Sequence, residues 1–442
     1  MSQSQSPPEK LRTDRLSGPD RPDAKDSRDP YQRDRDRILY SEYFRRLAGV
    51  TQVVSATEGE IFHNRLTHSL KVAQVARRIA ERLLRDNPSL AAHLDPEVVE
   101  AAALAHDLGH PPFGHVAEKQ LCKDAESFEL EDGFEGNAQT FRILTRLSVH
   151  RGKESGLELT RATLNAVLKY PWKRSDDKTS KHHSKYSCYS DDSDAFTFAR
   201  GLHDSGSEAL SIEAHVMDVA DSITYSVHDL EDFYRAGLIP LEKLARNENY
   251  RSEFLNRWKE SGRDPKAHAY AEVQSNFRKI KNLLEYCLSD TDEGGSRREL
   301  QLLEEFRSAA ITEFLSGITI STTGGLQDIQ MDPELRYQCK FLQRLVWDYV
   351  ILNPRLATQQ AGQEKIVSTL AHFFKDNLTH KRPDRIPSRF RKTAEELINE
   401  KADRKLARLA IDIVASLTES EAISLFKRVT GQHQGSILDR MP

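Results

Sequence analysis

Residues 106–115 read HDLGHPPFGH, a stretch that sets two glycines and two prolines among three histidines and an aspartate. Proline lacks an amide hydrogen and clashes with the preceding turn, and glycine lowers helix stability, so no regular helix continues through this stretch. An Ala-rich helical pattern over about residues 97–107 must therefore end in a tight loop. Three imidazoles on a rigid Gly/Pro loop are hard to explain as packing. We expect them to face a common cavity.

Helical periodicity dominates the chain on both sides of this loop. Residues 67–84 and 209–232 each place apolar side chains at helical spacing along one face. Only Ile318–Thr323, β-branched and bounded by glycines, indicates a strand. The predicted fold class is therefore all-α. Further helical stripes are expected over residues 241–260, 266–289, 296–315, 334–352, 363–377, 391–414 and 418–428.

The first 29 residues differ from the rest in composition. They alternate basic and acidic side chains among Ser and Pro, and such a segment gains too little from burial to offset its ordering entropy. We therefore expect a flexible charged tail over residues 1–29, a helical core over 30–240 and an accessory helical region over 241–442. Residues 173–194, rich in Lys, Ser and Asp, are expected to form a surface loop.

Composition limits the environment and the partners of the chain. Of its 442 residues 38% are hydrophobic and 30% charged, enough for a sizeable core under a well-solvated surface. The formal net charge of −4 provides no global attraction to duplex DNA or to an anionic membrane. The four cysteines are scattered and no long apolar run occurs. These features predict reduced thiols, no membrane partner and a cytoplasmic location.

Four residues of metal-ligand type run through the chain in the order His68, His106, Asp107 and a later aspartate. A lone histidine such as His68 is most often structural, and the His106–Asp107 pair could equally cap a helix end. The later aspartate lies in a strongly apolar helix, where a buried carboxylate needs a partner such as a cation. Spacing leaves Asp218 and Asp221 as alternatives. Such a set suits a catalytic divalent cation with open water positions.

Polar side chains near the loop suit a phosphate-containing substrate. Glu118 follows His115 at i+3, a spacing that lets a carboxylate orient an imidazole as a general acid or base. The guanidinium of Arg65 could contact a phosphate through two hydrogen bonds. Arg46 and Gln52 occur in a stretch that could form a pocket wall. Each signal is weak alone; together they predict metal-assisted hydrolysis of a phosphoester or phosphoanhydride.

Tyr225 and Asp229 extend this set on the helix that carries the later aspartate. They follow Asp221 at i+4 and i+8, so the three side chains are expected on one helix face. An ordinary solvated stripe would give the same spacing. The triplet therefore supports a phosphate site only in combination with the histidines.

Together these motifs resemble the deoxyguanosinetriphosphate triphosphohydrolase-like (dGTPase) family of the HD-domain metal-dependent phosphohydrolase superfamily. The H…HD…D order is the signature of the superfamily, and HDLGHPPFGH is highly specific for the narrower family. The family fold is an HD-domain helical core, here with additional C-terminal helices. The matching stretches cover about half of the chain: residues 44–47, 51–53, 65–69, 106–115 with Glu118, 133–139 and 169–172, and Asp221, Tyr225 and Asp229.

The resemblance implies metal ligation by His68, His106, Asp107 and Asp221, and so selects Asp221 over Asp218. For a site of this composition Mn²⁺, Mg²⁺ and Fe²⁺ all fit, and Zn²⁺ is less natural for phosphoryl chemistry. We therefore expect a divalent metal cofactor drawn from these three.

The resemblance also implies how the family reaction proceeds. Water attacks the α-phosphorus of a deoxynucleoside triphosphate, dGTP in the type case, and the products are a deoxynucleoside and inorganic triphosphate. His115, with Glu118 behind it, matches the catalytic histidine, and it could protonate the departing 5′-oxygen. His110 matches a histidine close to the α-phosphate. Members of the family typically assemble as homo-oligomers.

The substrate-binding residues are carried over in the same way. Arg65, Tyr225 and Asp229 match positions that contact the triphosphate and the sugar. Gln52 matches a position near the sugar and base, and Arg46 is grouped with it as substrate-binding.

Two departures from the family pattern bear on base preference. Where many members carry a Lys-Phe-Gly motif, residues 185–189 read KYSCY, and Gly136 stands where some relatives have histidine. The alternatives are another HD-domain phosphohydrolase (a nucleotidase, a cyclic-nucleotide phosphodiesterase or an alarmone hydrolase) or a regulator that senses nucleotides or binds single-stranded nucleic acid.

Overall fold

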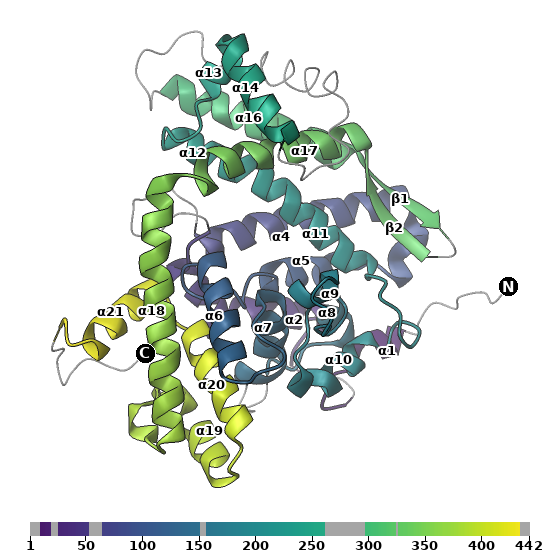
Figure 1. The fold of residues 1–442 in the computed structure, drawn as a ribbon. Coiled ribbons are helices and arrows are strands. Elements are labelled where there is room, and N and C mark those ends of the chain that lie inside the picture. Colours follow the sequence, from purple (N-terminus) through teal and green to yellow (C-terminus); the bar gives the residue numbers. More distant parts are fainter. Residues whose placement is uncertain are drawn as a thin grey trace. The chain divides into compact units, whose positions relative to one another are not determined.

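The computed structural model describes residues 9–18, 25–52, 64–150, 156–260, 297–323 and 326–433. The chain divides into two compact units (Figure 1). Residues up to Asp218, without 59–62, form the first unit together with Thr358–Pro442, and Val219–Ala357 belongs to the second. The predicted helix over 266–289 and the tail residues 1–8 and 19–24 lie outside the described residues.

The regular secondary structure of the described residues is helical apart from one two-stranded hairpin and isolated bridges, which confirms the predicted all-α class. Helices α11 (Ile212–Thr224) and α18 (Pro354–Thr379) each cross a boundary between the units in sequence. The other helices of the first unit are α1 (Glu9–Thr13), α2 (Pro30–Leu39), α3 (Glu42–Arg46), α4 (Arg65–Asp86), α5 (Pro96–Ala105), α6 (His115–Ser127), α7 (Gly136–Arg142), α8 (Arg161–Ala166), α9 (Lys181–Ser184), α10 (Ser193–Arg200), α19 (Ser388–Asn399), α20 (Asp403–Ala415) and α21 (Glu419–Val429).

Short 3₁₀ and π segments connect or continue these helices. The 3₁₀ turns are η1 (Leu47–Gly49), η2 (Pro88–Ala92), η4 (Ser190–Asp192) and η7 (Pro383–Arg385), and the π segments are η3 (Ile143–Leu147), η5 (Tyr225–Asp229) and η6 (Trp347–Ile351).

Helix α5 is packed against α2, α4 and α8 in the core of the first unit. Asp95 caps its N-terminus by accepting a hydrogen bond from the amide of Glu97 at 2.8 Å, and Pro96 opens the first turn. The Val, Ala and Leu residues that follow are all buried, as expected for a helix that is apolar around most of its circumference. Because α5 ends at Ala105, the residues His106 and Asp107 pass directly from this core into the loop.

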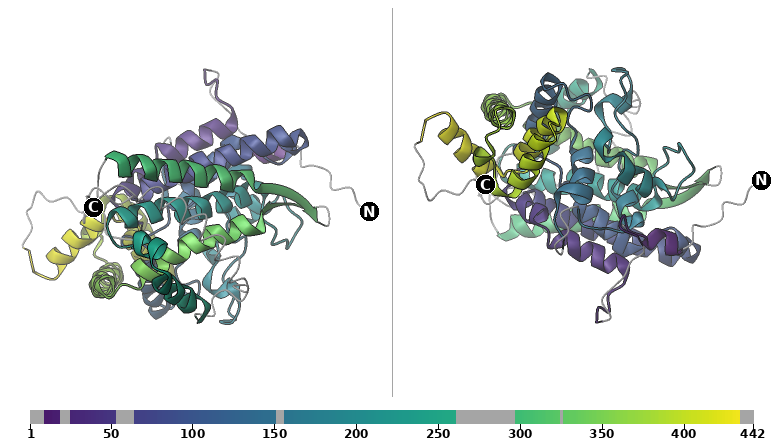
Figure 2. Two further views of the ribbon diagram at one scale, coloured as in Figure 1. Left: turned by 90° about the horizontal axis from the view of Figure 1, so that it is seen from above. Right: turned by 90° about the horizontal axis from the view of Figure 1, so that it is seen from below.

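A second apolar core joins α6 to the C-terminal helices α18–α21. Helix α20 lies alongside α6 in Figure 1, and α18 is seen nearly along its axis in both views of Figure 2. Residues from 358 onward therefore belong to the same unit as the loop, which differs from the division predicted at residue 240. Members of this core include Leu121, Ala125, Phe374, Leu409 and Ile413.

A buried charge network adds to this attachment. Nε of Arg142, at the end of α7, donates to Asp412 Oδ2 of α20 at 2.9 Å, and its Nη1 donates to Asp192 Oδ1 at 3.1 Å. Gln139 Nε2 donates to the other oxygen of Asp412 at 3.0 Å. Asp412 is fully buried, so these donors replace the water that its carboxylate loses on folding.

Buried ion pairs join part of the predicted tail to the rest of the first unit. Arg12 of α1 pairs with Glu213 of α11, and Arg15 pairs with Asp34 of α2 at 2.6 Å. All four side chains are at most 5% exposed. Buried charges of opposite sign compensate each other's lost hydration. The prediction of a tail considered only how few apolar residues the segment has, and so it left these ion pairs out. The prediction of a flexible tail is therefore wrong for residues 9–18.

The segment predicted as a surface loop at 173–194 is partly core. Tyr186 and Tyr189 are at most 1% exposed. The Tyr189 hydroxyl accepts a hydrogen bond from the amide of Glu135 at 3.3 Å, and the guanidinium of Arg408 lies 4.0 Å from the centre of its ring. Because polar residues surround these two tyrosines in the sequence, their burial was not predicted.

The second unit contains the hairpin and several helices. Strand β1 (Ile318–Thr323) coincides with the predicted strand, which is thereby confirmed, and pairs antiparallel with β2 (Leu326–Met331). Rings of Phe254, Trp258 and Phe341 contact one another in the core of this unit. Its other helices within the described residues are α12 (Leu230–Arg235), α13 (Leu241–Arg246), α14 (Glu248–Glu260), α16 (Arg297–Ser316) and α17 (Pro333–Val346).

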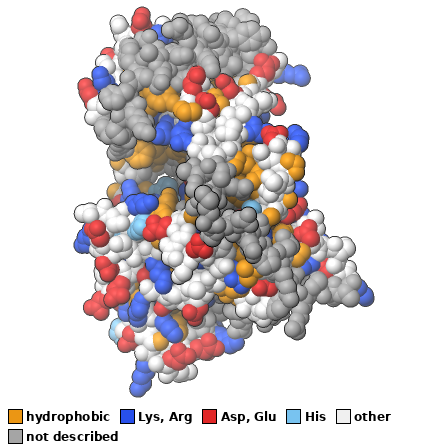
Figure 3. Space-filling model, turned by 90° about the vertical axis from the view of Figure 1, so that its right-hand side faces the viewer, with side chains coloured by type: hydrophobic (Ala, Val, Ile, Leu, Met, Phe, Trp, Pro, Cys, Tyr) orange, Lys and Arg blue, Asp and Glu red, His pale blue; other side chains and the backbone are white. Residues whose placement is uncertain are grey.

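The described surface mixes charges of both signs. The face drawn in Figure 3 shows basic and acidic side chains interspersed over many elements. This agrees with a chain that has 64 basic and 68 acidic residues. None of the helices described is both long and apolar enough to cross a membrane.

The buried network on α20 gives a stability prediction. Asp412→Ala leaves the guanidinium of Arg142 without one of its two carboxylates, and breaking a buried pair typically costs about 3–5 kcal/mol of unfolding free energy. Asp376→Ala removes an exposed carboxylate from α18 and should cost roughly 0.5 kcal/mol or less. Urea unfolding monitored by circular dichroism measures both. Equal unfolding midpoints for the two variants would contradict the expected contribution of the network to the free energy of unfolding.

Candidate functional site

Three of the four predicted metal ligands meet in the first unit. One ligand atom from each of His68, His106 and Asp107 lies within 4.8 Å of the others. His68 comes from the first turn of α4, and the other two follow the end of α5. All three side chains are buried, between 2% and 7% exposed. Helices that pack against each other therefore bring together residues almost forty positions apart in the sequence.

The orientation of His106 is fixed by the helix that precedes it. Its Nδ1 lies 2.7 Å from the carbonyl oxygen of Ala103. Only a protonated nitrogen can donate to a carbonyl, so Nδ1 carries a hydrogen and Nε2 is the ring nitrogen that remains for ligation. Nε2 lies 3.5 Å from Asp107 Oδ1. The backbone thus turns the ligating nitrogen of His106 toward the cluster, as is usual for metal-binding histidines.

Asp107 is held in its ionised form by its neighbours. Its Oδ2 accepts a hydrogen bond from Arg65 Nη1 at 2.6 Å, and its Oδ1 lies 3.1 Å from His110 Nδ1. Burial by itself raises the pKa of Asp107, but Arg65, His106 and His110 outweigh burial and hold the pKa well below its usual range. Burial and then the charge of Arg65 lower the pKa of His110 to about 4. The cluster therefore offers a carboxylate and neutral His110.

Thr140 of α7 forms hydrogen bonds with the backbone on one side of the loop. Its hydroxyl accepts a hydrogen bond from the amide of Gly109 at 2.9 Å and donates to the carbonyl oxygen of His106 at 3.2 Å. The approach is close enough that a Cβ on Gly109 would lie 2.1 Å from the carbonyl oxygen of Gly136. Glycine is thus required at 109 by the contact with α7, a reason that the sequence alone did not reveal.

Arg46 holds the loop from the other side. Its Nη2 donates to the carbonyl oxygens of Leu108 and His110 at 2.8 and 2.7 Å, and its Nη1 donates to that of Leu417 at 2.9 Å. Burial lowers the pKa of Arg46 to about 10. The guanidinium of Arg46 thus donates to three backbone carbonyls. Its predicted contact with substrate stays a prediction.

Glu419, the first residue of α21, is a further support that sequence reasoning missed. It is 2% exposed, and its Oε1 accepts hydrogen bonds from the amides of Thr51 at 2.8 Å and Phe113 at 3.3 Å. Phe113 has φ 68°, a conformation that is unusual for a residue with a side chain. A carboxylate more than 300 positions later in the chain thus helps to hold the strained part of the loop.

The structure brings the predicted dyad of His115 and Glu118 into contact. The dyad opens α6, and His115 Nδ1 lies 2.8 Å from Glu118 Oε2. The side chain of Glu118 is 10% exposed and that of His115 is 67% exposed. The ring of His110 meets that of His115 edge to face, with centroids 5.2 Å apart. His110 therefore bridges the cluster at Asp107 and the dyad.

The other oxygen of Glu118 has partners that the sequence did not indicate. Its Oε1 accepts hydrogen bonds from the amide of Gly136 at 3.1 Å and from Lys185 Nζ at 3.3 Å. Lys185 Nζ also donates to Glu135 Oε1 at 2.8 Å. Lys185 was noted in the sequence only as part of a departure from a family motif. Its long side chain crosses from the end of α9 to the dyad.

The remaining predicted residues are placed as follows. Asp218, the alternative to Asp221, forms an ion pair with Lys169 at 2.7 Å and so has a partner of its own. Asp221 and Asp229 lie in the second unit, where burial and then the charges of both raise the pKa of Tyr225. Gln52, in the first unit, is partly buried. Ligation by Asp221 and the substrate contacts of these residues stay predictions.

The donor set of the cluster suits a divalent cation. Two imidazole nitrogens and one carboxylate oxygen are borderline to hard ligands, and three protein ligands leave positions for water and substrate. Their burial and the mutual distance of at most 4.8 Å fit one ion. His68, His106 and Asp107 could therefore hold a metal.

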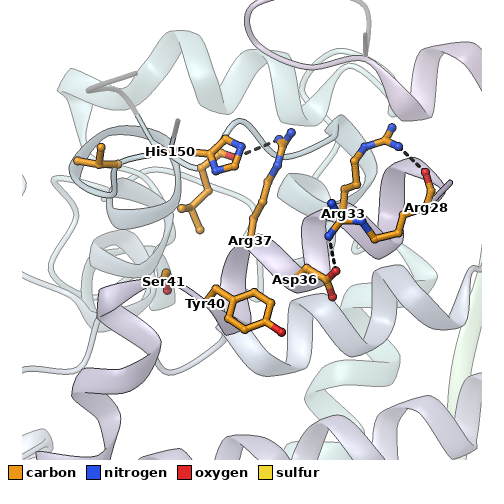
Figure 4. A pocket seen from close by; sticks show the side chains of 9 residues that line it. Arg28, Arg33, Asp36, Arg37, Tyr40, Ser41 and His150 are labelled. Carbon is orange, nitrogen blue, oxygen red and sulfur yellow. Dashed lines mark hydrogen bonds and ion pairs between the residues drawn. The ribbon is translucent and has the colours of Figure 1, made fainter. Parts of the chain in front are cut away.

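A pocket is lined by residues other than these (Figure 4). Arg28 is paired with Asp26 and Asp36, at 2.8 and 2.5 Å. Arg33 donates to the carbonyl oxygen of Arg28, and Arg37 to backbone carbonyls of the segment that precedes α8. Groups of the chain itself thus already engage these guanidinium groups. None of the predicted site residues lines this pocket, which is formed by Arg28, Arg33, Asp36, Arg37, Tyr40, Ser41, Val149, His150 and Leu157.

Comparisons with known proteins agree with this site. Residues 65–226 match the HD domain family, and residues 329–428 match the phosphohydrolase-associated domain. A deoxyguanosinetriphosphate triphosphohydrolase-like protein of Streptomyces coelicolor is 36% identical over 93% of this chain and 95% of its own length. Proteins of the same name from Corynebacterium efficiens and Wolinella succinogenes are 34% and 31% identical, over 92% and 91% of this chain and 92% and 96% of their own lengths.

The cluster predicts that His106→Ala removes metal binding. Loss of a direct ligand should weaken Mn²⁺ binding by more than the roughly 10–100-fold that loss of an outer hydrogen-bond partner costs. Calorimetric titration of metal-stripped protein with MnCl₂ measures this. His203→Ala, which removes a half-buried imidazole bonded to Asn165, is the matched control and should bind Mn²⁺ as the parent does. Unchanged affinity in His106→Ala would refute the assignment.

The support from α7 predicts a smaller effect for Thr140→Val. This change keeps the shape of the side chain and removes the hydroxyl that joins Gly109 to His106, so Mn²⁺ affinity should fall roughly tenfold. In Thr145→Val, a nearby control, the lost hydroxyl only donates to the carbonyl oxygen of Phe141. The same titration compares them, and an equal effect in both variants would argue against a role for Thr140 in the site.

Proposed function

Because the chain belongs to the deoxyguanosinetriphosphate triphosphohydrolase-like family of HD-domain proteins, we propose that it cleaves a deoxynucleoside triphosphate into a deoxynucleoside and inorganic triphosphate. That the chain is a phosphohydrolase follows from the family. The proposal adds the substrate, dGTP foremost, from the printed name of the relatives. It also adds the bond that is cleaved.

One observation carries the proposal: a candidate metal cluster and a hydrogen-bonded His–Glu pair lie at the two ends of the same loop. His110 Nδ1 lies 3.1 Å from Asp107, and the ring of His110 contacts that of His115. A phosphate that reaches the cluster would therefore also be near an imidazole able to exchange a proton. Hydrolysis of a phosphoester needs both an electrophilic group at the phosphate and a proton donor at the leaving oxygen.

We assign metal ligation to His68, His106 and Asp107, with Asp221 as the fourth ligand from the resemblance to the family. A divalent ion bound there, Mn²⁺, Mg²⁺ or Fe²⁺, would supply Lewis acidity toward the α-phosphate and an activated water. The Nδ1–H of His106 is fixed by a backbone carbonyl, which keeps its Nε2 ready for ligation.

His115 is the proton donor in this proposal. Glu118 accepts a hydrogen bond from its Nδ1 at 2.8 Å and so orients the ring, which leaves Nε2 to give a proton to the departing 5′-oxygen. The imidazole is largely exposed, as a group that meets a substrate must be. His110 is assigned a place near the α-phosphate, between the cluster and the dyad.

The substrate contacts are assigned from the family pattern. Arg65, Tyr225 and Asp229 would contact the triphosphate and sugar, and Gln52 the sugar and base. Arg46 has its guanidinium engaged by carbonyls of the loop, so the role we assign to it is to shape the loop that faces the substrate.

Two other functions would use parts of the same site. Another HD-domain phosphohydrolase would share the cluster and differ in the bond it cleaves. A regulator that senses nucleotides or binds single-stranded nucleic acid would need neither the cluster nor the dyad. The co-occurrence of a buried donor set and a hydrogen-bonded His–Glu pair favours an enzyme.

Product analysis tests the proposal. Metal-stripped protein is incubated with each of the four common dNTPs and with Mn²⁺, Mg²⁺ or Fe²⁺, and the products are separated by anion-exchange chromatography. The expected products are a deoxynucleoside and inorganic triphosphate in equal amounts. Release of pyrophosphate or monophosphate would assign another HD-domain hydrolysis, and substrate left intact under all conditions would favour a regulator.

A further inference from the structure

Two buried carboxylates beside the loop share one cation. Lys185 Nζ lies 2.8 Å from Glu135 Oε1 and 3.3 Å from Glu118 Oε1. The side chains of Glu118 and Glu135 are 10% and 2% exposed, and that of Lys185 is 40% exposed. Two carboxylates this close repel each other in a poorly hydrated place unless a positive charge lies between them. Lys185 supplies that charge.

The two oxygens of Glu118 have separate partners. Oε2 accepts the hydrogen bond from His115, whereas Oε1 accepts from Lys185 and from the amide of Gly136. Contacts to Oε1 fix the rotation of the carboxylate, and this rotation decides whether Oε2 points at His115. The geometry of the dyad therefore depends on groups that His115 does not touch.

Lys185 is itself held in place by its backbone. The indole nitrogen of Trp172 donates to the carbonyl oxygen of Lys185 at 2.6 Å, and the amide of Lys185 donates to the carbonyl oxygen of Lys181 at 3.2 Å. Glu135 is fixed as well, because its side chain caps α7 by accepting from the amide of Ala138 at 3.2 Å. Lys185 and the second carboxylate that binds its ammonium thus both start from anchored positions.

We propose that Lys185 is a positioning residue, which holds Glu118 turned toward His115 and so keeps the imidazole oriented for proton transfer. The expected effect on turnover rests on the proposed function. The expected effect on the geometry of the dyad rests on the hydrogen bonds alone. It gives a role to the segment in which this chain departs from the Lys-Phe-Gly pattern.

Electrostatics agree with this geometry. Burial raises the pKa of Glu118, but the hydrogen bond from His115 and the charge of Lys185 outweigh it and hold that pKa well below its usual range. Burial and the charge of Glu118 raise the pKa of Glu135. The titratable groups that act on Glu118 or are acted on by it are His110, His115, Cys122, Glu135 and Lys185.

A second cation is the competing explanation. Ligand atoms of His110, His115 and Glu118 also lie within 4.8 Å of one another. An ion bound there would face the ammonium of Lys185, which already lies 3.3 Å from the carboxylate that would have to hold it. Like charges at that distance disfavour the ion. The structure therefore favours a hydrogen-bonded dyad over a second metal centre.

Kinetics of Lys185→Met and Lys185→Arg test the proposal on the full chain loaded with Mn²⁺. In Lys185→Met kcat should fall roughly 10–100-fold with KM little changed, since the proton donor loses its orientation. A guanidinium can also contact two carboxylates, so Lys185→Arg should recover most of kcat. Lys181→Met removes an exposed ammonium from the same helix, where it lies over the ring of Trp172, and should leave kcat and KM unchanged.

The pH dependence has a definite sign. Lys185 lowers the pKa of Glu118, so the pKa rises in Lys185→Met, and the ionised carboxylate that orients His115 is then lost at a higher pH. The acid limb of kcat/KM should move upward in Lys185→Met and return in Lys185→Arg. A raised KM with unchanged kcat and an unchanged acid limb would show that Lys185 binds substrate instead, and would overturn the proposal.

A measurement without turnover separates this inference from the proposed function. Nitrogen-15 NMR of metal-free, histidine-labelled protein reports the hydrogen bond of His115 Nδ1, assigned with His115→Gln. The signal should change in Lys185→Met and not in Lys181→Met; an unchanged signal overturns the positioning role. If it changes while no dNTP yields triphosphate, the positioning role stands and the proposed function fails.

The number of bound Mn²⁺ ions per chain tests the competing explanation. A second bound Mn²⁺ that is lost in His115→Gln would overturn the proposal in favour of a second metal site.

Discussion

The loop after α5 makes hydrogen bonds within its own backbone at His110 and Gly114, and the site depends on how its other backbone groups are satisfied. A buried amide or carbonyl without a partner costs free energy comparable to a lost hydrogen bond. Here Arg46, Thr140 and Glu419 provide the partners, each from a different helix. Because the loop cannot move without breaking these contacts, His106 and His115 at its two ends keep fixed positions relative to each other.

Sequence reasoning recovered the features that depend on local pattern. Helical periodicity predicted the all-α class, and β-branched residues predicted the strand Ile318–Thr323. The types and order of His68, His106 and Asp107 marked them as one set, and the structure groups their side chains. The i+3 spacing of Glu118 also predicted its contact with His115 correctly. Each of these signals lies within a few residues, or within a family motif, and needs no knowledge of which distant segments meet.

What sequence reasoning missed is carried by long-range pairs of charged and polar groups. Thr140 and Lys185 reach the site from 31 and 67 positions away, and Glu419 from 306. Arg12 and Glu213 order a segment that its composition marks as a tail. In each case an isolated polar residue looks solvated in the sequence, and only its partner in the fold makes its burial favourable.

The C-terminal helices are therefore part of the site and not an appendage to it. The phosphohydrolase-associated match covers residues 329–428, but the chain after Thr358 packs in the first unit, where it shares a core with α6. Asp412 binds α7, which carries Thr140, and Glu419 binds the loop itself. Residues 65–226 include Thr140 but not Arg46 or Glu419, which both bond to the backbone of the loop. Most of both family matches, residues 65–218 and 358–428, thus belongs to one structural unit, whose sequence is interrupted by Val219–Ala357.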